Sequence, residues 1–499
     1  PVGSYEVTIE KTGFAPYAQG PIVLRLNQDA DLRVRLELAG VVERVTVRAD
    51  APLINTTDAE VGVNFDTKRI SELPLATNRN VLNLALSVAG VSQLQTGQAT
   101  APLGGGSVPM AVNGMRVRSN NFTVDGQDSN NSLNTGQLQT INNPDVVAEV
   151  RMVTNQFTAQ YGGAAGSVVN VITKSGTNQF HGSAFWFQNN NHLNSRSNLD
   201  KQLSSSSPFR AENQFGGTLG GPVIHDKTFF FGSIQRWTDR RLGSGVSIRG
   251  VPTDEGRSLL RSIAGTRPTV QALLDFLPPA QQAVPGLTAP VQIGGNRFNI
   301  PLGLLSGSSN IRFDDWQWSG RVDHRFSDRH SLGFRYLGDD QVNSGDGQVT
   351  PPGLSTVISR SAQSLSAFLT SSFSARFFNE LRISYRRFAN DTDGIDQRAK
   401  QIPSIEIPEL GLNGAAASPT RTAIGLAIGA PNTNFDNNYQ LQDTVSLIRG
   451  PHVLKFGIDF RNERISAFNL LRQRGSLVYT TLQDLVNDTA NSGTIVSPL

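Results

Sequence analysis

The acidic and amide side chains best placed for chemistry lie close together, where Asp125-Gly126 is followed by Asp128 and Asn130. Oxygen ligands at this density could bind a cation, but the twelve-residue spacing and terminal glutamate of a calcium-binding loop are missing. We therefore expect Asp125-Gly126 to form a tight turn, with a metal site as the less favoured alternative.

The rest of the sequence offers no catalytic set. The six histidines are scattered, and the lack of cysteine excludes a disulfide scaffold, a thiolate metal site and a cysteine nucleophile. The glycine run 104–106 lacks the Lys-Ser/Thr of a phosphate-binding loop. The 44 basic residues nearly balance 41 acidic ones and form no dense patch for nucleic acid. The sequence thus predicts no enzyme, no cofactor and no metal.

Two or more domains are expected, because 499 residues exceed what one soluble core usually holds. No stretch approaches the roughly 18 consecutive apolar residues of a transmembrane helix, although membrane strands hide their signal in alternation. The opening Pro-Val-Gly-Ser-Tyr resembles the interior of a domain, so we expect a fragment of a longer protein.

The second half alternates apolar and polar residues with a period of two, as in β-strands with one apolar and one wet face. In the segment 316–326, Trp316, Val322 and Phe326 share one parity and polar side chains fill the other. Nine segments have this character: 179–189, 212–222, 227–238, 315–326, 329–339, 361–373, 377–389, 437–448 and 452–464. A tenth strand is expected at 475–481.

The connections between these segments distinguish a membrane barrel from a soluble β-sandwich. Short turns alternate with long polar excursions, which cover 190–211, 239–314, 340–360 and 390–436. Outer-membrane barrels have this arrangement, with short periplasmic turns and long outside loops. We therefore expect a mainly β protein containing part of a transmembrane antiparallel β-barrel, with about nine or ten strands of a total near 22.

Charged side chains indicate which face is wet. A charge facing lipid at mid-bilayer costs about 2–4 kcal/mol, so the charged parity should face the lumen. The charges expected there are Arg321, Asp323, Arg325, Arg382, Arg386, Lys455 and Asp459. We expect solvation and cross-strand pairing for them rather than ligand contact. The segment 255–277 has helical periodicity broken near Pro268, which favours a folded cap in an outside loop over a lid.

Residues 61–176 have a different sequence pattern, in which short helices and short strands are mixed. They predict a small α+β domain of a size that folds on its own. The expected elements are helices at 67–73 and 78–88 and strands at 111–126, 146–154 and 167–176. Asn78 is the expected N-cap of the second helix.

This region also carries a sequence pattern. A strand ending in Asp-Gly precedes a Glu/Arg/Val strand, a Tyr-Gly step, a small-residue turn and a hydrophobic strand ending in Thr-Lys. The residues concerned are Asp125, Gly126, Glu149, Arg151, Tyr161, Gly162, Gly166 and Lys174. The pattern resembles the plug of TonB-dependent outer-membrane receptors. Residues 154–157, TNQF, replace the Gly-Pro step that is usual in the family. This sequence, together with the following HGSAFWF, resembles the Oar-like subgroup.

The N-terminal region resembles the end of a carboxypeptidase-regulatory-like β-sandwich over residues 1–40, with strands expected at 3–10, 22–26 and 32–38. A linker, 41–60, follows it. Within the linker, the residues Val42, Glu43, Val45, Thr46 and Val47 resemble a TonB box. Such a segment would pair as an added strand with a partner's sheet edge. An equal alternative makes 41–48 the last sandwich strand, and both could hold in different states.

The resemblance implies an outer-membrane active transporter. Its plug, 61–176, would fill the barrel begun by 177–499, and a TonB-type energy-transducing protein would rearrange the plug to admit a scarce solute. The implied partners are outer-membrane lipid, the TonB-type protein and an oligosaccharide, peptide or chelate, without nucleic acid. Three alternatives remain: a surface structural or adhesion protein anchored by the barrel, a soluble multi-domain β-sandwich binding protein, and a passive conduit for secreted enzymes or peptides.

Overall fold

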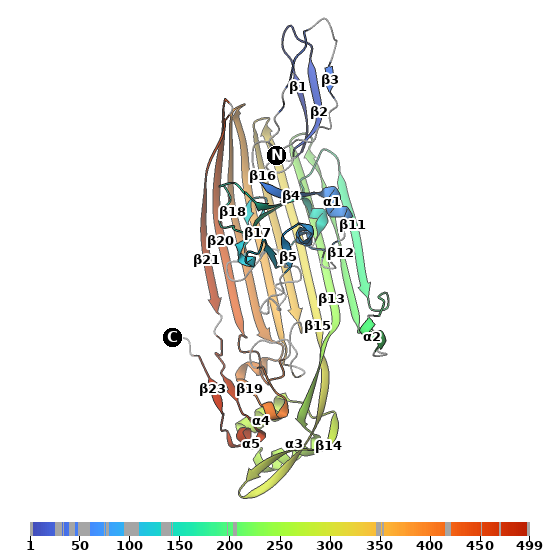
Figure 1. The fold of residues 1–499 in the computed structure, drawn as a ribbon, viewed down its shortest axis with the longest axis vertical. Helices are drawn as coiled ribbons and strands as arrows, with labels where there is room; N and C mark the ends of the chain where they lie inside the picture. Colours follow the sequence, from blue (N-terminus) through green and yellow to red (C-terminus); the bar gives the residue numbers. More distant parts are fainter. Residues whose placement is uncertain are drawn as a thin grey trace.

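One long, curved antiparallel sheet dominates the computed structural model (Figure 1). The structure describes residues 3–24, 32, 34–38, 45–47, 60–73, 75, 79–93, 109–130, 141, 143–196, 198–202, 207–345, 351, 354–414, 421–450, 452–468 and 471–496. The curved sheet contains, in spatial order, β11 (His181–Asn190), β12 (Arg210–Ile224), β13 (Thr228–Pro252), β15 (Asn296–Ser327), β16 (His330–Ser344), β17 (Thr356–Ser374), β18 (Phe377–Gly394), β20 (Asn432–Arg449) and β21 (His452–Phe468). This confirms the nine predicted strands.

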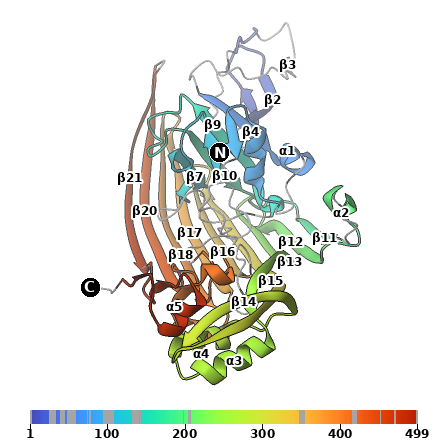
Figure 2. The ribbon, with the colours of Figure 1, turned by 60° about the horizontal axis from the view of Figure 1, so that its bottom comes forward.

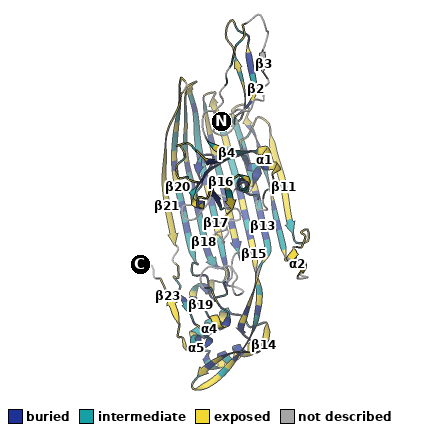
Figure 3. Ribbon diagram, viewed as in Figure 1, coloured by how far each residue is buried: buried dark blue, intermediate teal, exposed yellow. Residues whose placement is uncertain are grey.

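The curved sheet is open, since β11 and β21 are its two edges and do not pair with each other (Figure 2). Alternation places the apolar parity on its outer face: Val322 is 44% exposed and Phe326 61%. Opposite parity faces the concave side, where Gln317 is only 8% exposed (Figure 3). A period of two thus sorts apolar and polar side chains onto the two faces.

Inside the curve lies a smaller sheet, which we call the inner sheet, with the order β4 (Val61–Asp66), β9 (Val147–Asn155), β10 (Ser167–Thr173), β7 (Asn120–Val124) and β8 (Gln127–Asp128). Short elements accompany it: α1 (Thr67–Glu72), η1 (Val81–Ser87), β5 (Val91–Gln93), β6 (Met110–Val112), η3 (Val117–Ser119) and η4 (Pro144–Val146). β10 pairs antiparallel with β9 and parallel with β7, so it is the central, buried strand. Its Val169 and Val171 belong to a core that also contains Phe231 of the curved sheet.

The helices of this region follow their capping residues. The Asp66 side chain accepts a hydrogen bond from the Arg69 N–H and begins α1, which confirms the helix expected at 67–73. The second helix is the 3-10 helix η1, whose N-cap is Asn80. Asn78, the expected cap, lies outside the described residues.

At the end of the curved sheet where the turns are short, β1 (Gly3–Ile9), β2 (Tyr17–Leu24) and β3 (Val45–Val47) form a three-stranded sheet (Figure 1). The strand expected at 32–38 is wrong for the described residues there: only Leu38 pairs, through an isolated bridge to Phe14.

At the opposite end, three chain excursions form one packed body, which we call the cap (residues 246–306, 395–414, 421–431 and 471–496) (Figure 2). Leu354, between β16 and β17, adds one side chain to its core. Its elements, besides the ends of β13 and β15, are α3 (Asp254–Ala264), α4 (Pro268–Phe276), β14 (Gln282–Ile293), η5 (Gln397–Gln401), β19 (Ser404–Glu406), η6 (Pro408–Leu410), β22 (Ser476–Val478), α5 (Leu482–Asn487) and β23 (Ser492–Thr494). The two helices α3 and α4 confirm the prediction for 255–277. The short helix α2 (Asn198–Gln202) lies outside the cap, between β11 and β12.

Two expectations for this end are wrong. The segment 239–314 is no polar loop, because β13 and β15 remain paired beyond the curved sheet, with Ile248 opposite Leu305. The segment 475–481 supplies no tenth strand to the curved sheet: β22 pairs with β19 and β23, and Tyr479 is buried in the cap core. Among the described helices, none has both the length and the apolarity required to span a membrane.

Candidate functional site: the contact between the inner sheet and the barrel wall

A tight turn joins β7 to β8 and carries Asp125, which is followed by Asp128 at the end of β8. Asp125 and Gly126 both have positive φ, of 48° and 79°. Glycine adopts this conformation without strain, and a Cβ at Gly126 would displace the Arg382 guanidinium, which lies against it. The turn therefore lies directly against the wall of the curved sheet.

Asp125 is the first anchor of this turn. Its carboxylate accepts hydrogen bonds from the Thr173 N–H at 2.9 Å and the Thr173 hydroxyl at 2.8 Å. From the wall, Arg335 Nη1 approaches to 3.0 Å and Arg321 Nη1 to 3.7 Å. The Arg335 side chain is only 1% exposed, so this buried cation depends on Asp125 for its counter-charge.

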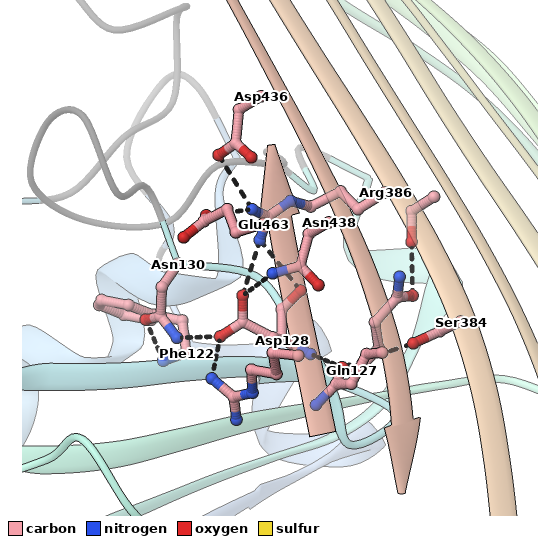
Figure 4. A network of polar contacts seen from close by, with 12 residues as sticks. Phe122, Gln127, Asp128, Asn130, Ser384, Arg386, Asp436, Asn438 and Glu463 are labelled. Atoms are coloured by element: carbon pink, nitrogen blue, oxygen red, sulfur yellow. Dashed lines mark hydrogen bonds and ion pairs between the residues drawn. The ribbon is translucent and has the colours of Figure 1, made fainter. Parts of the chain in front are cut away.

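Asp128 is the second anchor and ties the turn to two further strands (Figure 4). Arg386 Nη1 lies 2.8 Å from one carboxylate oxygen and Arg461 Nη1 lies 2.9 Å from the other. The Arg386 guanidinium also contacts Asp436 at 3.0 Å and Glu463 at 3.5 Å. The charges alternate in sign through this cluster, which is how buried ions are stabilised.

Gln127 lies between the two anchors and adds neutral contacts. Its side-chain oxygen accepts hydrogen bonds from Arg335 and from the Ser364 hydroxyl, and its amide donates to the Tyr385 carbonyl at 3.2 Å. Asp128 also contacts Gln440 and Asn438 of β20, so the turn contacts six wall strands: β15, β16, β17, β18, β20 and β21. We call residues 125–128 with these wall partners the latch.

The other residues of the plug-like pattern lie elsewhere in the same domain. Glu149 is buried on β9, and Arg151 pairs with Glu60. The Gly162 carbonyl accepts from Asn121, and the Gly166 N–H donates to the Ser119 carbonyl. These contacts hold the loop after β9 against β7.

Two members of the pattern lie at the ends of that region. The Tyr161 N–H donates to the Thr158 carbonyl. The Lys174 N–H donates to the Val146 carbonyl, and burial lowers the pKa of the Lys174 ammonium, against the opposing effect of Asp145.

The structure brings some of the wall charges expected in the lumen to the inner sheet. Arg321 donates to the Thr173 carbonyl and pairs with Asp323, whose carboxylate accepts from Ser175. Arg382 lies against Gly126. Arg386 belongs to the latch.

The remaining wall charges lie outside the latch. Asp459 pairs with Arg461, while Arg325 and Lys455 are exposed near the short turns. Arg335 was not among the predicted residues. The alternation in 329–339 could have identified it as inward-facing, because it lies on the face of the strand opposite to that of Leu332 and Phe334.

The TonB-box-like segment is only partly described. Val42 and Glu43 lie outside the described residues. Val45, Thr46 and Val47 form β3, which runs parallel to β2 with Tyr17 opposite Val45.

Among the described residues no cluster of three metal-ligating side chains occurs. The carboxylates of Asp125 and Asp128, which the sequence offered as candidate cation ligands, both face guanidinium groups. Charges so arranged repel a metal ion, and the latch instead suits mechanical attachment of one sheet to another.

Comparisons with known proteins agree with this architecture. Residues 172–495 match the family described as an outer membrane beta barrel domain. The TonB-dependent transporter Oar of Myxococcus xanthus is 29% identical over 270 residues, which are 52% of this chain and 24% of Oar. The ferrienterobactin receptor of Escherichia coli (strain K12) is 27% identical over 172 residues, which are 32% of this chain and 21% of the receptor.

A solved structure shares the fold. The outer membrane transporter YddB from Escherichia coli superposes with a TM-score of 0.51 at 12% identity, over 84% of this chain and 50% of YddB. The chain therefore spans about a quarter of Oar and half of YddB.

Proposed function

The chain belongs to the family of outer membrane beta barrel domains, whose place is the bacterial outer membrane, and from this premise we propose that it forms part of a TonB-dependent transporter. In this proposal the curved sheet is the first part of the barrel wall and residues 61–176 are its plug. A scarce solute would bind on the long-loop side and pass when the plug moves.

The latch supports the plug role more directly than any other feature. The turn at residues 125–128 contacts six wall strands, and its ion pairs with Arg335 and Arg386 are almost fully buried. Removing one partner from a buried ion pair typically costs about 3–5 kcal/mol, so thermal motion alone would rarely release the turn. Release would need work, which a partner that pulls on the N-terminal side of the plug could supply.

The proposed point of pulling is the segment 41–48. Val45–Val47 forms a strand that pairs parallel with β2, so these three residues adopt extended structure. A partner sheet could add the same backbone as its own edge strand. Val42 and Glu43 are part of this proposal, as is the further role of the segment as the last strand of the N-terminal sheet when no partner is bound.

The test is deletion of residues 41–48 in the full-length protein. The probe is the solute that the wild-type protein retains in native mass spectrometry, labelled for uptake by cells. Uptake should be lost in the deletion variant and in cells whose proton gradient is collapsed, while surface binding of the solute persists. Unchanged uptake in both conditions would refute energised transport. The nature of the solute, an oligosaccharide, a peptide or a chelate, follows from the same mass measurement.

A second function, surface structure or adhesion with the barrel as anchor, is favoured by the cap. Its three excursions share a core that contains Leu260, Ile405 and Leu485, so the cap is a folded body rather than a set of loops. The deletion of 41–48 also separates the two functions. An adhesin would keep cell attachment without that segment and would show no solute uptake before the deletion.

A further inference from the structure

Several arginines lie on the outer parity of the curved sheet, near the cap end. Arg387 of β18 shares its parity with Ile383, which is 58% exposed, and Arg464 of β21 shares its parity with Phe460, which is 60% exposed. These arginines therefore face away from the lumen, unlike Arg386 of the latch. They are adjacent, because Asn437 of β20 is directly opposite Arg387 on one side and Arg464 on the other.

The depth of this group matches a membrane boundary. Arg387 comes about ten residues after the start of β18, which at about 3.3 Å per residue and a tilt near 40° is about 25 Å from the short-turn end. That equals the height of the apolar band of an outer-membrane barrel. Tyr385 and Tyr439, whose rings lie 5.0 Å apart, mark the same level as interfacial aromatic residues do. The arginines thus lie where the outer-leaflet headgroups begin.

The two guanidinium groups are held in place by neutral partners. Arg387 lies over the Phe435 ring at 5.2 Å and donates to Asn437 Oδ1 at 3.3 Å. Arg464 lies over the Tyr439 ring at 5.7 Å. Tyr385 donates its hydroxyl hydrogen to the same Asn437 oxygen at 2.9 Å. Ordering of this kind lowers the entropy cost of binding an anion.

Neither arginine has a counter-charge within the part of the chain that the structure describes. No ion pair to a described carboxylate involves Arg387 or Arg464. Asp391 lies on the same face of β18, four positions after Arg387, but its carboxylate accepts a hydrogen bond from the Thr433 hydroxyl. A second group of arginines on the outer face differs in this respect, because Arg236, Arg240 and Arg312 all pair with the Asp314 carboxylate.

We propose that Arg387, Asn437 and Arg464 form a binding site on the outer wall for the phosphorylated headgroup of an outer-leaflet lipid. Guanidinium groups bind phosphate oxygens through paired, charge-assisted hydrogen bonds, and the stems of both side chains cover apolar surface while the charges reach the headgroup level. The site requires only the membrane location of the barrel. It does not depend on transport.

The test uses the full-length protein, purified in detergent, stripped of lipid and mixed with lipid A that carries both phosphates. Native mass spectrometry should show one lipid retained with an affinity about tenfold lower in R387Q/R464Q than in the wild type, the loss expected for charge-assisted contacts. The control R329Q/R449Q removes equal charge at the short turns and should bind like the wild type. The same lipid without phosphates should bind weakly to all three proteins.

Two results would overturn the site: equal retention by R387Q/R464Q and the wild type, or equal retention of the phosphate-free lipid. Circular dichroism and a heat-stable gel shift of each variant show whether the barrel has folded. Solute uptake should be unchanged in R387Q/R464Q, so failure of the lipid site and failure of transport remain distinguishable.

Discussion

Asp128 of the inner sheet and Arg386 of the barrel wall lie 258 positions apart in the chain, yet their charged atoms meet at 2.8 Å. Both side chains are almost fully buried, at 5% and 3% exposure. The pair connects two sheets that share little backbone contact. Its loss should therefore affect the attachment between the sheets more than either sheet alone.

Asp128→Asn keeps the shape of the side chain and removes its charge. Arg386 would keep Asp436 and Glu463, but Arg386 and Arg461 would both lose their counter-charge on the inner sheet, and we expect attachment to weaken by about 3 kcal/mol. Hydrogen exchange measured by mass spectrometry should be faster in β7, and cells should become sensitive to a bulky antibiotic that the outer membrane normally excludes.

The matched control for that change is Glu60→Gln. It removes the ion pair with Arg151, in which both partners belong to the inner domain. Antibiotic sensitivity should stay at the wild-type level. If both variants leak equally, general destabilisation explains the result and the latch has no special role.

Glycine at position 126 can be tested against a second glycine with nearly the same backbone. Gly126 and Gly114 have φ values of 79° and 76°, so alanine carries a similar strain at both, about 1–2 kcal/mol. Only at Gly126 would the new Cβ also displace the Arg382 guanidinium, whereas no described residue lies within 4 Å of a Cβ at Gly114. The free energy of unfolding, from urea melts in detergent, should fall further for Gly126→Ala than for Gly114→Ala. Equal losses would show that the Arg382 side chain moves aside without a cost in stability.

Movement of the inner domain relative to the wall can be blocked covalently, because the chain has no cysteine of its own. Asp145 and Ser183 meet across the contact at 2.8 Å, so D145C/S183C should be joined by a short, cleavable dithiol crosslinker. We expect uptake of the retained solute to stop and to return when the linker is cleaved.

The control for crosslinking is S183C/T218C, a pair within the wall that is directly opposite in register. Its crosslinking should leave uptake unchanged. Uptake that continues in crosslinked D145C/S183C would mean that solute passes without separation of the inner domain from β11.

Strand periodicity predicted the nine strands and the inward face of Arg321 and Arg386, because a period of two fixes the face of every side chain in a strand. The same rule could not show which inward charges meet the inner sheet, since that depends on contacts between residues such as Asp128 and Arg461 that are 333 positions apart. Total strand number and the domain boundaries remain predictions.

The cap was the least predictable part. Its strand β19 pairs parallel with β22, with Ser404 opposite Ser476. A local sequence pattern cannot identify a partner strand so distant in the chain. The segment 475–481 suggested a wall strand, but it forms a strand of three residues between β19 and β23, with Tyr479 buried in the cap core. Sequence periodicity reports which side chains are buried and does not identify what buries them.

The cap offers a final test, of whether its three excursions fold as one unit. Leu485 of α5 is fully buried, and its carbonyl accepts from Thr269 of α4, a residue 216 positions away. Leu485→Ala should cost about 2–5 kcal/mol through loss of packing and the cavity it leaves. If the cap is one unit, hydrogen exchange should increase in α3 and α4 as much as in α5, with β16 and β17 unchanged. Val496→Ala, at a 38% exposed position in the same excursion, is the control and should change exchange little. Faster exchange confined to α5 would show that the excursions unfold separately and that the cap is not one folded body.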